Sequence, residues 1–140
     1  MPSPLVRGSL ALLLAACGSA DDRSFARDVW PILQARCVKC HTTPAGQMTP
    51  NMGDQQASGL GIGANDPAFA YDALIDKHAT FAPELVYVEP GSSATSYLYH
   101  KVAGTQASVG GVGGTMPPGG ALTTEELATI REWIDAGALE

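Results

Sequence analysis

The sequence predicts a single, mostly helical domain, because four segments carry helix signals and one short stretch has the pattern of an extended chain. The predicted helices cover residues 25–41, 66–78, 92–102 and 123–136. Segments rich in glycine and proline separate them, and no internal repeat is visible. A length of 140 residues suits one domain.

Ser24 can cap the first helix at its N-terminus. The helix then carries one apolar stripe at helical spacing, formed by Phe25, Val29, Ile32 and Leu33. Pro31 interrupts the hydrogen-bond ladder, so we expect this helix to be kinked or to begin near Val29.

The middle of the chain alternates loops with short elements. Residues 42–65 predict a long loop, which is unusual unless it has a role such as wrapping a cofactor. Asp66 and Pro67 supply the N-cap and first-turn proline of a helix that is expected to reach His78. Residues 81–89 favour one short strand.

The C-terminal half contains two further helices around a glycine-rich segment. The third helix opens near Ser92 and can direct inward the residues Tyr97, Leu98 and Val102. Residues 104–120 contain seven glycines and no periodicity, which predicts a flexible loop. Thr123 and Glu126 form a capping box for the last helix, and Gly137 suits its end.

Cys37-Val38-Lys39-Cys40-His41, at the end of the first helix, is the attachment pattern of a c-type haem. Thiols three positions apart can form thioethers with the two vinyl groups of one porphyrin. The imidazole of His41 then stands close enough to bind the iron. The motif therefore predicts one covalent haem c on Cys37 and Cys40, with His41 as the proximal iron ligand.

Other uses of this motif fit the sequence less well. A zinc site would need a second pair of cysteines or histidines, whereas the only further cysteine is Cys17. A thioredoxin-like dithiol would follow a strand, whereas a helix is predicted before Cys37. The remaining non-haem alternative is a cell-envelope lipoprotein in which the pair is structural or forms a local disulfide.

Residues 1–16 have the pattern of an export signal. Arg7 precedes an apolar run at 10–16 that is about half the length of a membrane span. Leu-Ala-Ala-Cys, ending at Cys17, resembles a bacterial lipobox, so we expect cleavage before Cys17 and lipidation of it. The alternative is an ordinary signal peptide with an incidental cysteine.

Removal of the predicted signal peptide leaves a short tether at 17–23 and a predicted haem domain at 24–140. Export agrees with haem c, since its attachment takes place outside the cytoplasm. Gly18 follows the cysteine where an aspartate would mark inner-membrane retention. We therefore expect a lipid-anchored protein on the periplasmic side of the cell envelope, with the outer membrane favoured.

Net charge limits the class of partner. The formal charge of the whole sequence is −6, and loss of Arg7 with the signal makes the remainder one charge more negative. Nucleic-acid binding is excluded on these grounds. Acidity favours a redox partner protein with a basic docking face, and an association rate that falls as salt rises.

Met116 is the leading candidate for the distal iron ligand. A thioether opposite a histidine keeps haem iron in a higher-potential range suited to carrying electrons. A flexible glycine run would let the loop cross the haem face, and Pro117 and Pro118 would stiffen it past the ligand. A surface methionine is the alternative, and the competing donors are Met48, Met52, His78 and His100.

Three stretches resemble the small mono-haem class I type bacterial cytochromes c, in a lipoprotein form similar to myxobacterial and planctomycete domains. They are residues 25–33 before the haem motif, 90–99 in the middle, and 116–138 at the end. The resemblance spans most of residues 24–138, and the haem pentapeptide is its highly specific part.

The resemblance implies an all-α, cytochrome c-like domain wrapped around one haem, with the N- and C-terminal helices packed near the haem edge. It also implies thioethers at Cys37 and Cys40, His41 as proximal ligand and Met116 as distal ligand. The predicted function is an exported, lipid-anchored cytochrome that transfers single electrons between redox partners.

Catalysis is not expected, because a six-coordinate iron has no free position for a substrate and no acid–base or nucleophilic set is visible. The alternative function is a haem-based ligand-binding or sensing protein, or a weakly peroxidatic one, with a labile Met116.

Overall fold

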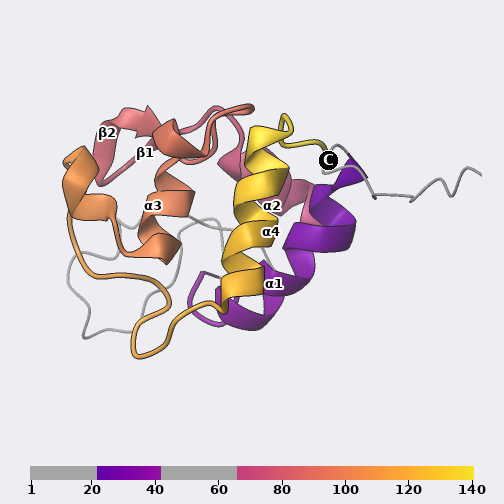
Figure 1. Cartoon of the computed structure of the whole chain (residues 1–140), viewed down its shortest axis with the longest axis horizontal. Coiled ribbons are helices and arrows are strands. Elements are labelled where there is room, and N and C mark those ends of the chain that lie inside the picture. Colours follow the sequence, from indigo (N-terminus) through magenta and orange to yellow (C-terminus); the bar gives the residue numbers. More distant parts are fainter. Residues whose placement is uncertain (1–21, 42–65) are drawn as a thin grey trace, which may run out of the picture.

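The computed structural model describes residues 22–41 and 66–140 (Figure 1). The predicted signal peptide, Cys17 and most of the tether lie outside the described residues. So does the predicted loop at 42–65, with its alternative donors Met48 and Met52.

The first helical segment changes type at the position that Pro31 predicts. A π-helical turn, η2 (Phe25–Val29), is followed by α1 (Trp30–Arg36). Ser24 caps the segment as predicted, because its hydroxyl accepts the backbone N–H of Arg27 at 3.3 Å. Pro31 lies in the first turn of α1, where a missing N–H costs no helical hydrogen bond.

Helix α2 (Pro67–Leu74) begins where predicted and ends four residues early. The Asp66 carboxylate accepts the N–H groups of Ala68 and Phe69, at 3.0 and 3.4 Å. Ile75 turns to extended backbone, and Asp76 takes a left-handed φ of 53°. His78 therefore lies in strand β1, whereas the sequence predicted it at the end of this helix.

A small antiparallel sheet follows, formed by β1 (His78–Ala79) and β2 (Ala82–Val86). Strand β2 confirms the extended stretch predicted at 81–89. The all-α class is wrong, however, because this sheet adds a β element to the four α-helices of the described residues. The short β1 was missed because its two residues continue the apolar spacing of α2, and pairing with β2 overrides that local signal.

The third helical segment is a 3₁₀ turn (Ser93–Thr95) followed by α3 (Tyr97–Ala103). The three residues predicted to face inward are buried, namely Tyr97, Leu98 and Val102. Gly104 ends α3 with a φ of 75°, and a second 3₁₀ turn, η5 (Gln106–Val109), lies inside the glycine-rich segment.

Helix α4 (Thr124–Asp135) carries the predicted capping box. Thr123 donates its backbone N–H to the Glu126 carboxylate at 2.8 Å, and Glu126 returns its own N–H to the Thr123 hydroxyl at 3.2 Å. Beyond the helix Gly137 has a φ of 106°, as a residue at this position requires.

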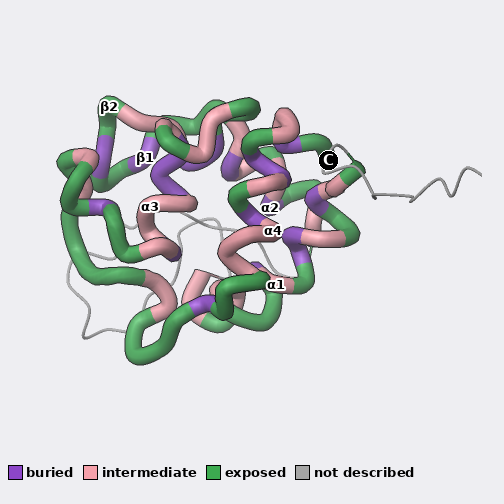
Figure 2. The backbone as a smooth tube through the Cα atoms, viewed as in Figure 1, coloured by how far each residue is buried: buried purple, intermediate pink, exposed green. Residues whose placement is uncertain are grey.

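The core is one cluster of buried residues to which η2, α1, α2, the sheet region, α3 and α4 all contribute (Figure 2). Part of it lies where η2 crosses α4. Phe25 and Trp133 are fully buried, with ring centroids 5.4 Å apart, and Tyr71 meets Phe25 edge-on at 5.5 Å. The Leu139 carbonyl accepts the Trp133 indole N–H at 2.7 Å and the Phe25 backbone N–H at 2.8 Å. The N- and C-terminal helical segments thus pack together.

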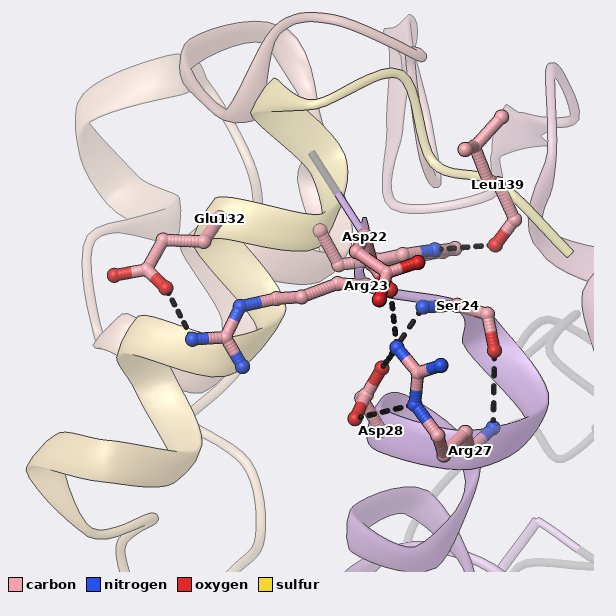
Figure 3. A network of polar contacts seen from close by, with 8 residues as sticks. Asp22, Arg23, Ser24, Arg27, Asp28, Glu132 and Leu139 are labelled. Atoms are coloured by element: carbon pink, nitrogen blue, oxygen red, sulfur yellow. Dashed lines mark hydrogen bonds and ion pairs between the residues drawn. The ribbon is translucent and has the colours of Figure 1, made fainter. Parts of the chain in front are cut away.

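Charged groups close the outer side of this crossing (Figure 3). Arg23 reaches across to Glu132 of α4 at 2.5 Å. Arg27 contacts Asp28 at 2.9 Å and the Asp22 carbonyl, while Asp28 also accepts the Ser24 N–H. In the part of the chain described, no helix is long and apolar enough to cross a membrane.

Candidate functional site

The haem-attachment motif forms one hydrogen-bonded turn that continues α1. The N–H of Cys37 is donated to the Leu33 carbonyl at 2.8 Å. The Cys37 carbonyl then accepts from Cys40 at 3.0 Å and from His41 at 3.1 Å. Residues three and four apart on such a turn are neighbours on one face. Cys40 and His41 therefore follow Cys37 within one hydrogen-bonded turn.

Both cysteines are half-buried and carry free thiols. Burial, reinforced by the neighbouring Cys40 and by Glu126, raises the pKa of Cys37 to about 11. A reactive dithiol needs a lowered thiol pKa, so this environment disfavours the thioredoxin-like alternative. The free thiols also differ from the local disulfide that the non-haem alternative considered.

An ion pair braces the motif against the last helix. Arg36, just before Cys37, donates hydrogen bonds to both carboxylate oxygens of Glu126, at 3.0 and 3.3 Å. Glu126 lies in the first turn of α4. Hydrogen bonds from the Thr123 N–H and from Arg36 lower the pKa of Glu126. This contact fixes the end of α1 beside the start of α4.

Met116 lies on the loop that leads into α4. It is half-buried, and its N–H is donated to the Lys101 carbonyl at 2.9 Å. Figure 1 shows the end of α1 and this loop at the same end of the molecule, where α4 begins. The motif and Met116 are thus carried by two segments that converge on the first turn of α4.

The glycine loop, residues 104–120, is bound rather than free. Its carbonyls at three successive positions accept side-chain hydrogen bonds from α3 and η5. Tyr97 donates its hydroxyl to Val112 at 3.3 Å, and Lys101 donates its ammonium to Val112 at 3.1 Å and to Gly114 at 2.5 Å.

Gln106 completes this set by donating its amide to the Gly113 carbonyl at 3.0 Å. We call Tyr97, Lys101 and Gln106 the loop clamp. The composition of the loop predicted flexibility, and the clamp was missed. The available signal was Tyr97 and Lys101 at helical i, i+4 spacing beside a glycine run whose carbonyls no side chain shields.

The two alternative histidine ligands are occupied in other ways. His100 uses both ring nitrogens, at 2.8 Å from the Thr105 hydroxyl and 2.9 Å from the Ala94 carbonyl. His78 is exposed on β1, with its Nδ1 3.1 Å from the Pro83 carbonyl. Ligation by His100 would require one of its two contacts to break.

The described residues fit the requirements of a c-type haem. Two thiols and a histidine on one turn are the set that haem c attachment requires, and Met116 would supply a soft sixth donor. Over residues 22–41 and 66–140, no group of three or more His, Cys, Asp or Glu side chains could hold a metal ion.

Comparisons with known proteins give one partial likeness. No model of a protein family matches the chain. The chain is 30% identical over 125 residues to hydrazine synthase subunit alpha of Kuenenia stuttgartiensis, covering 81% of this chain and 15% of that protein. It thus spans a small part of its relative's length.

A solved structure, Kuenenia stuttgartiensis hydrazine synthase, overlaps 82% of this chain and 16% of its own chain. The TM-score is 0.40 at 22% identity, a level that assigns no fold. The sequence match nevertheless corrects one expectation. We expected an electron carrier and not an enzyme, whereas the protein that this chain resembles in part is a subunit of an enzyme.

Proposed function

We propose that residues 24–140 are a haem c domain, bound through Cys37, Cys40, His41 and Met116, that passes single electrons to or from a redox enzyme. The observation that carries this proposal is the motif turn, which brings two free thiols and an imidazole into one hydrogen-bonded turn at the end of α1. When bound, the haem would supply one-electron oxidation and reduction.

The chain's own residues would perform three tasks. Cys37 and Cys40 would hold the group covalently, and the ion pair of Arg36 with Glu126 would keep their turn fixed against α4. His41 and Met116 would each donate to one side of the iron. A fixed pair of donors keeps the structural change between redox states small, which favours rapid electron transfer.

The link to an enzyme is supported by the partial match to hydrazine synthase subunit alpha. A domain of this kind can serve a redox enzyme as a covalently joined part or as a separate partner. We propose, as expected from the sequence, that lipidated Cys17 anchors it to a membrane on the periplasmic side. The negative net charge favours a basic docking face on the partner.

The test is to produce the full chain with c-type maturation machinery and to record intact mass and visible spectra in both redox states. We expect the mass of one added haem, a pyridine haemochrome of the thioether-linked type, and a sulfur-to-iron charge-transfer band in the oxidised form. Bare polypeptide with two alkylatable thiols at 37 and 40 would overturn the proposal.

The ligand-binding alternative depended on a mobile Met116. The bonds that the loop clamp makes to carbonyls two to four residues before Met116 weaken that argument. Carbon monoxide separates the two functions, because tight and fast binding by the reduced protein would favour an open distal position.

A further inference from the structure

We infer that Lys101 is the positioning residue for Met116, and that its side chain holds the glycine loop in the conformation in which the thioether can stay on the iron. This inference rests on the proposed function, since it assigns a role toward the same haem. It concerns side chains on α3 and η5 that the haem motif does not include.

Lys101 contacts the loop at three points. Its ammonium donates to the carbonyls of Val112 and Gly114, and its backbone carbonyl accepts the N–H of Met116 itself. One residue therefore holds the loop both at Met116 and two to four positions before it. Its side chain is half-buried, and this burial lowers the pKa of the ammonium.

Two glycines of the loop lie so close to neighbouring residues that a side chain at either position would collide or crowd them. Gly111 lies against the Tyr97 ring, and a Cβ there would be 2.7 Å from the Tyr97 hydroxyl oxygen. Gly104 ends α3 beside Thr115, where a Cβ would be 3.1 Å from the threonine hydroxyl. The glycines thus allow close approach to α3, and they leave side chains outside the loop to restrain it.

This arrangement has a chemical consequence. A methionine is a weak, neutral ligand, and a loop of seven glycines carries a high entropy of ordering. Without restraint, the conformational entropy of the free loop would oppose binding of the Met116 thioether to the iron. Charged hydrogen bonds to loop carbonyls remove much of that freedom before the thioether binds. Lys101 would thereby set how often the iron loses its sixth ligand.

The experiment compares Lys101→Met with Lys101→Arg in the haem-loaded full chain. Methionine keeps the apolar stem and the backbone bond to Met116 but removes the ammonium, whereas arginine keeps a cationic donor. Lys77→Met, at an exposed lysine on the segment before β1, is the matched control. We would measure the charge-transfer band, the rate of carbon monoxide binding to the reduced protein, and amide hydrogen exchange at residues 112–116.

We expect Lys101→Met to bind carbon monoxide on the order of ten-fold faster, to weaken the charge-transfer band, and to exchange its loop amides faster. Lys101→Arg should recover part of each change, and Lys77→Met should match the wild type. Thermal unfolding would show whether each variant is folded. Tyr97→Phe, which removes one weaker bond, should give a smaller change of the same sign.

Two results would overturn the inference, and they are distinguishable. If the wild type shows the charge-transfer band but Lys101→Met is unchanged in ligand binding and exchange, Lys101 does not position Met116 and the proposed function stands. If the wild type lacks the band, Met116 is not the ligand and both proposals fail.

Discussion

The motif turn and the glycine loop frame the same candidate site but are built in opposite ways. The motif turn continues α1 through backbone hydrogen bonds between neighbouring residues, ending at His41. The glycine loop has almost no local bonding from residue 111 to 115, and side chains of α3 and η5 hold it.

The two segments differ in which residues determine their conformation. A turn that follows a capped helix is specified by residues within about ten positions of it, so a change there acts locally. The loop is held by Tyr97 and Lys101 of α3, which lie outside it, and by Gln106 near its own start. A change in α3 can therefore alter Met116 without touching the loop's own sequence.

Replacing both thiols should have the largest effect. We expect Cys37→Ser with Cys40→Ser to abolish covalent haem, because no sulfur remains on the turn to form a thioether. Intact mass and denaturing haem staining measure this loss. Cys17→Ser is the control, since it removes the predicted lipid anchor and should retain the haem. Covalent haem on the double variant would show that attachment lies elsewhere.

Met116→Ala should come next. Loss of the thioether should lower the reduction potential on the order of 0.1 V or more, within the wide span that axial ligands control, and remove the charge-transfer band. A redox titration followed by absorbance measures both. The control variants Met48→Leu and Met52→Leu should leave them unchanged, and a loss of the band in either one would reassign the ligand.

Gly111→Ala tests whether the glycine loop packs closely against Tyr97. The new methyl would collide with the Tyr97 ring, so we expect a loss of about 1–3 kcal/mol in the free energy of unfolding. Gly114→Ala is the matched control, because nothing lies within 4 Å of a Cβ there. Urea denaturation measures both variants, and equal losses would contradict the contact with Tyr97.

The smallest effect should come from Glu126, on the motif side. Its pKa is lowered in the fold, so its contribution to stability is present above its ordinary pKa, near 4.5, and is lost as the pH falls through the lowered value. For this partly exposed pair we expect about 1 kcal/mol or less.

Glu126→Gln should therefore flatten the loss of stability between about pH 5 and pH 3. Unfolding by urea at a series of pH values measures the change. The exposed neighbour Glu125→Gln serves as the control. If both variants keep the same acid profile as the wild type, the hydrogen bonds from the Thr123 N–H and from Arg36 do not stabilise the Glu126 carboxylate.

Local signals predicted much of this structure. Ser24, Asp66 and the pair Thr123 with Glu126 each cap the helix that they were expected to cap, because capping involves residues two to four apart. The Cys37–His41 motif is also a local pattern, and its assignment to haem c stays a prediction.

Features that depend on distant residues could not be predicted. The early end of α2 and the strand β1 require pairing with β2, which outweighs helical spacing around His78. The restraint of the glycine loop depends on side chains of α3, which lie outside the loop. The contact between Arg36 and Glu126 joins residues 90 positions apart, and no sequence pattern near either residue predicts it.

The Leu139 carbonyl has a structural consequence beyond the core. By binding both Phe25 and Trp133, it fastens the last residues of the folded unit to its first helical turn. A module whose entry and exit are adjacent can be spliced into a surface loop of a larger polypeptide with little disturbance to either. This architecture therefore suits both a separate domain and a domain inserted into a larger protein.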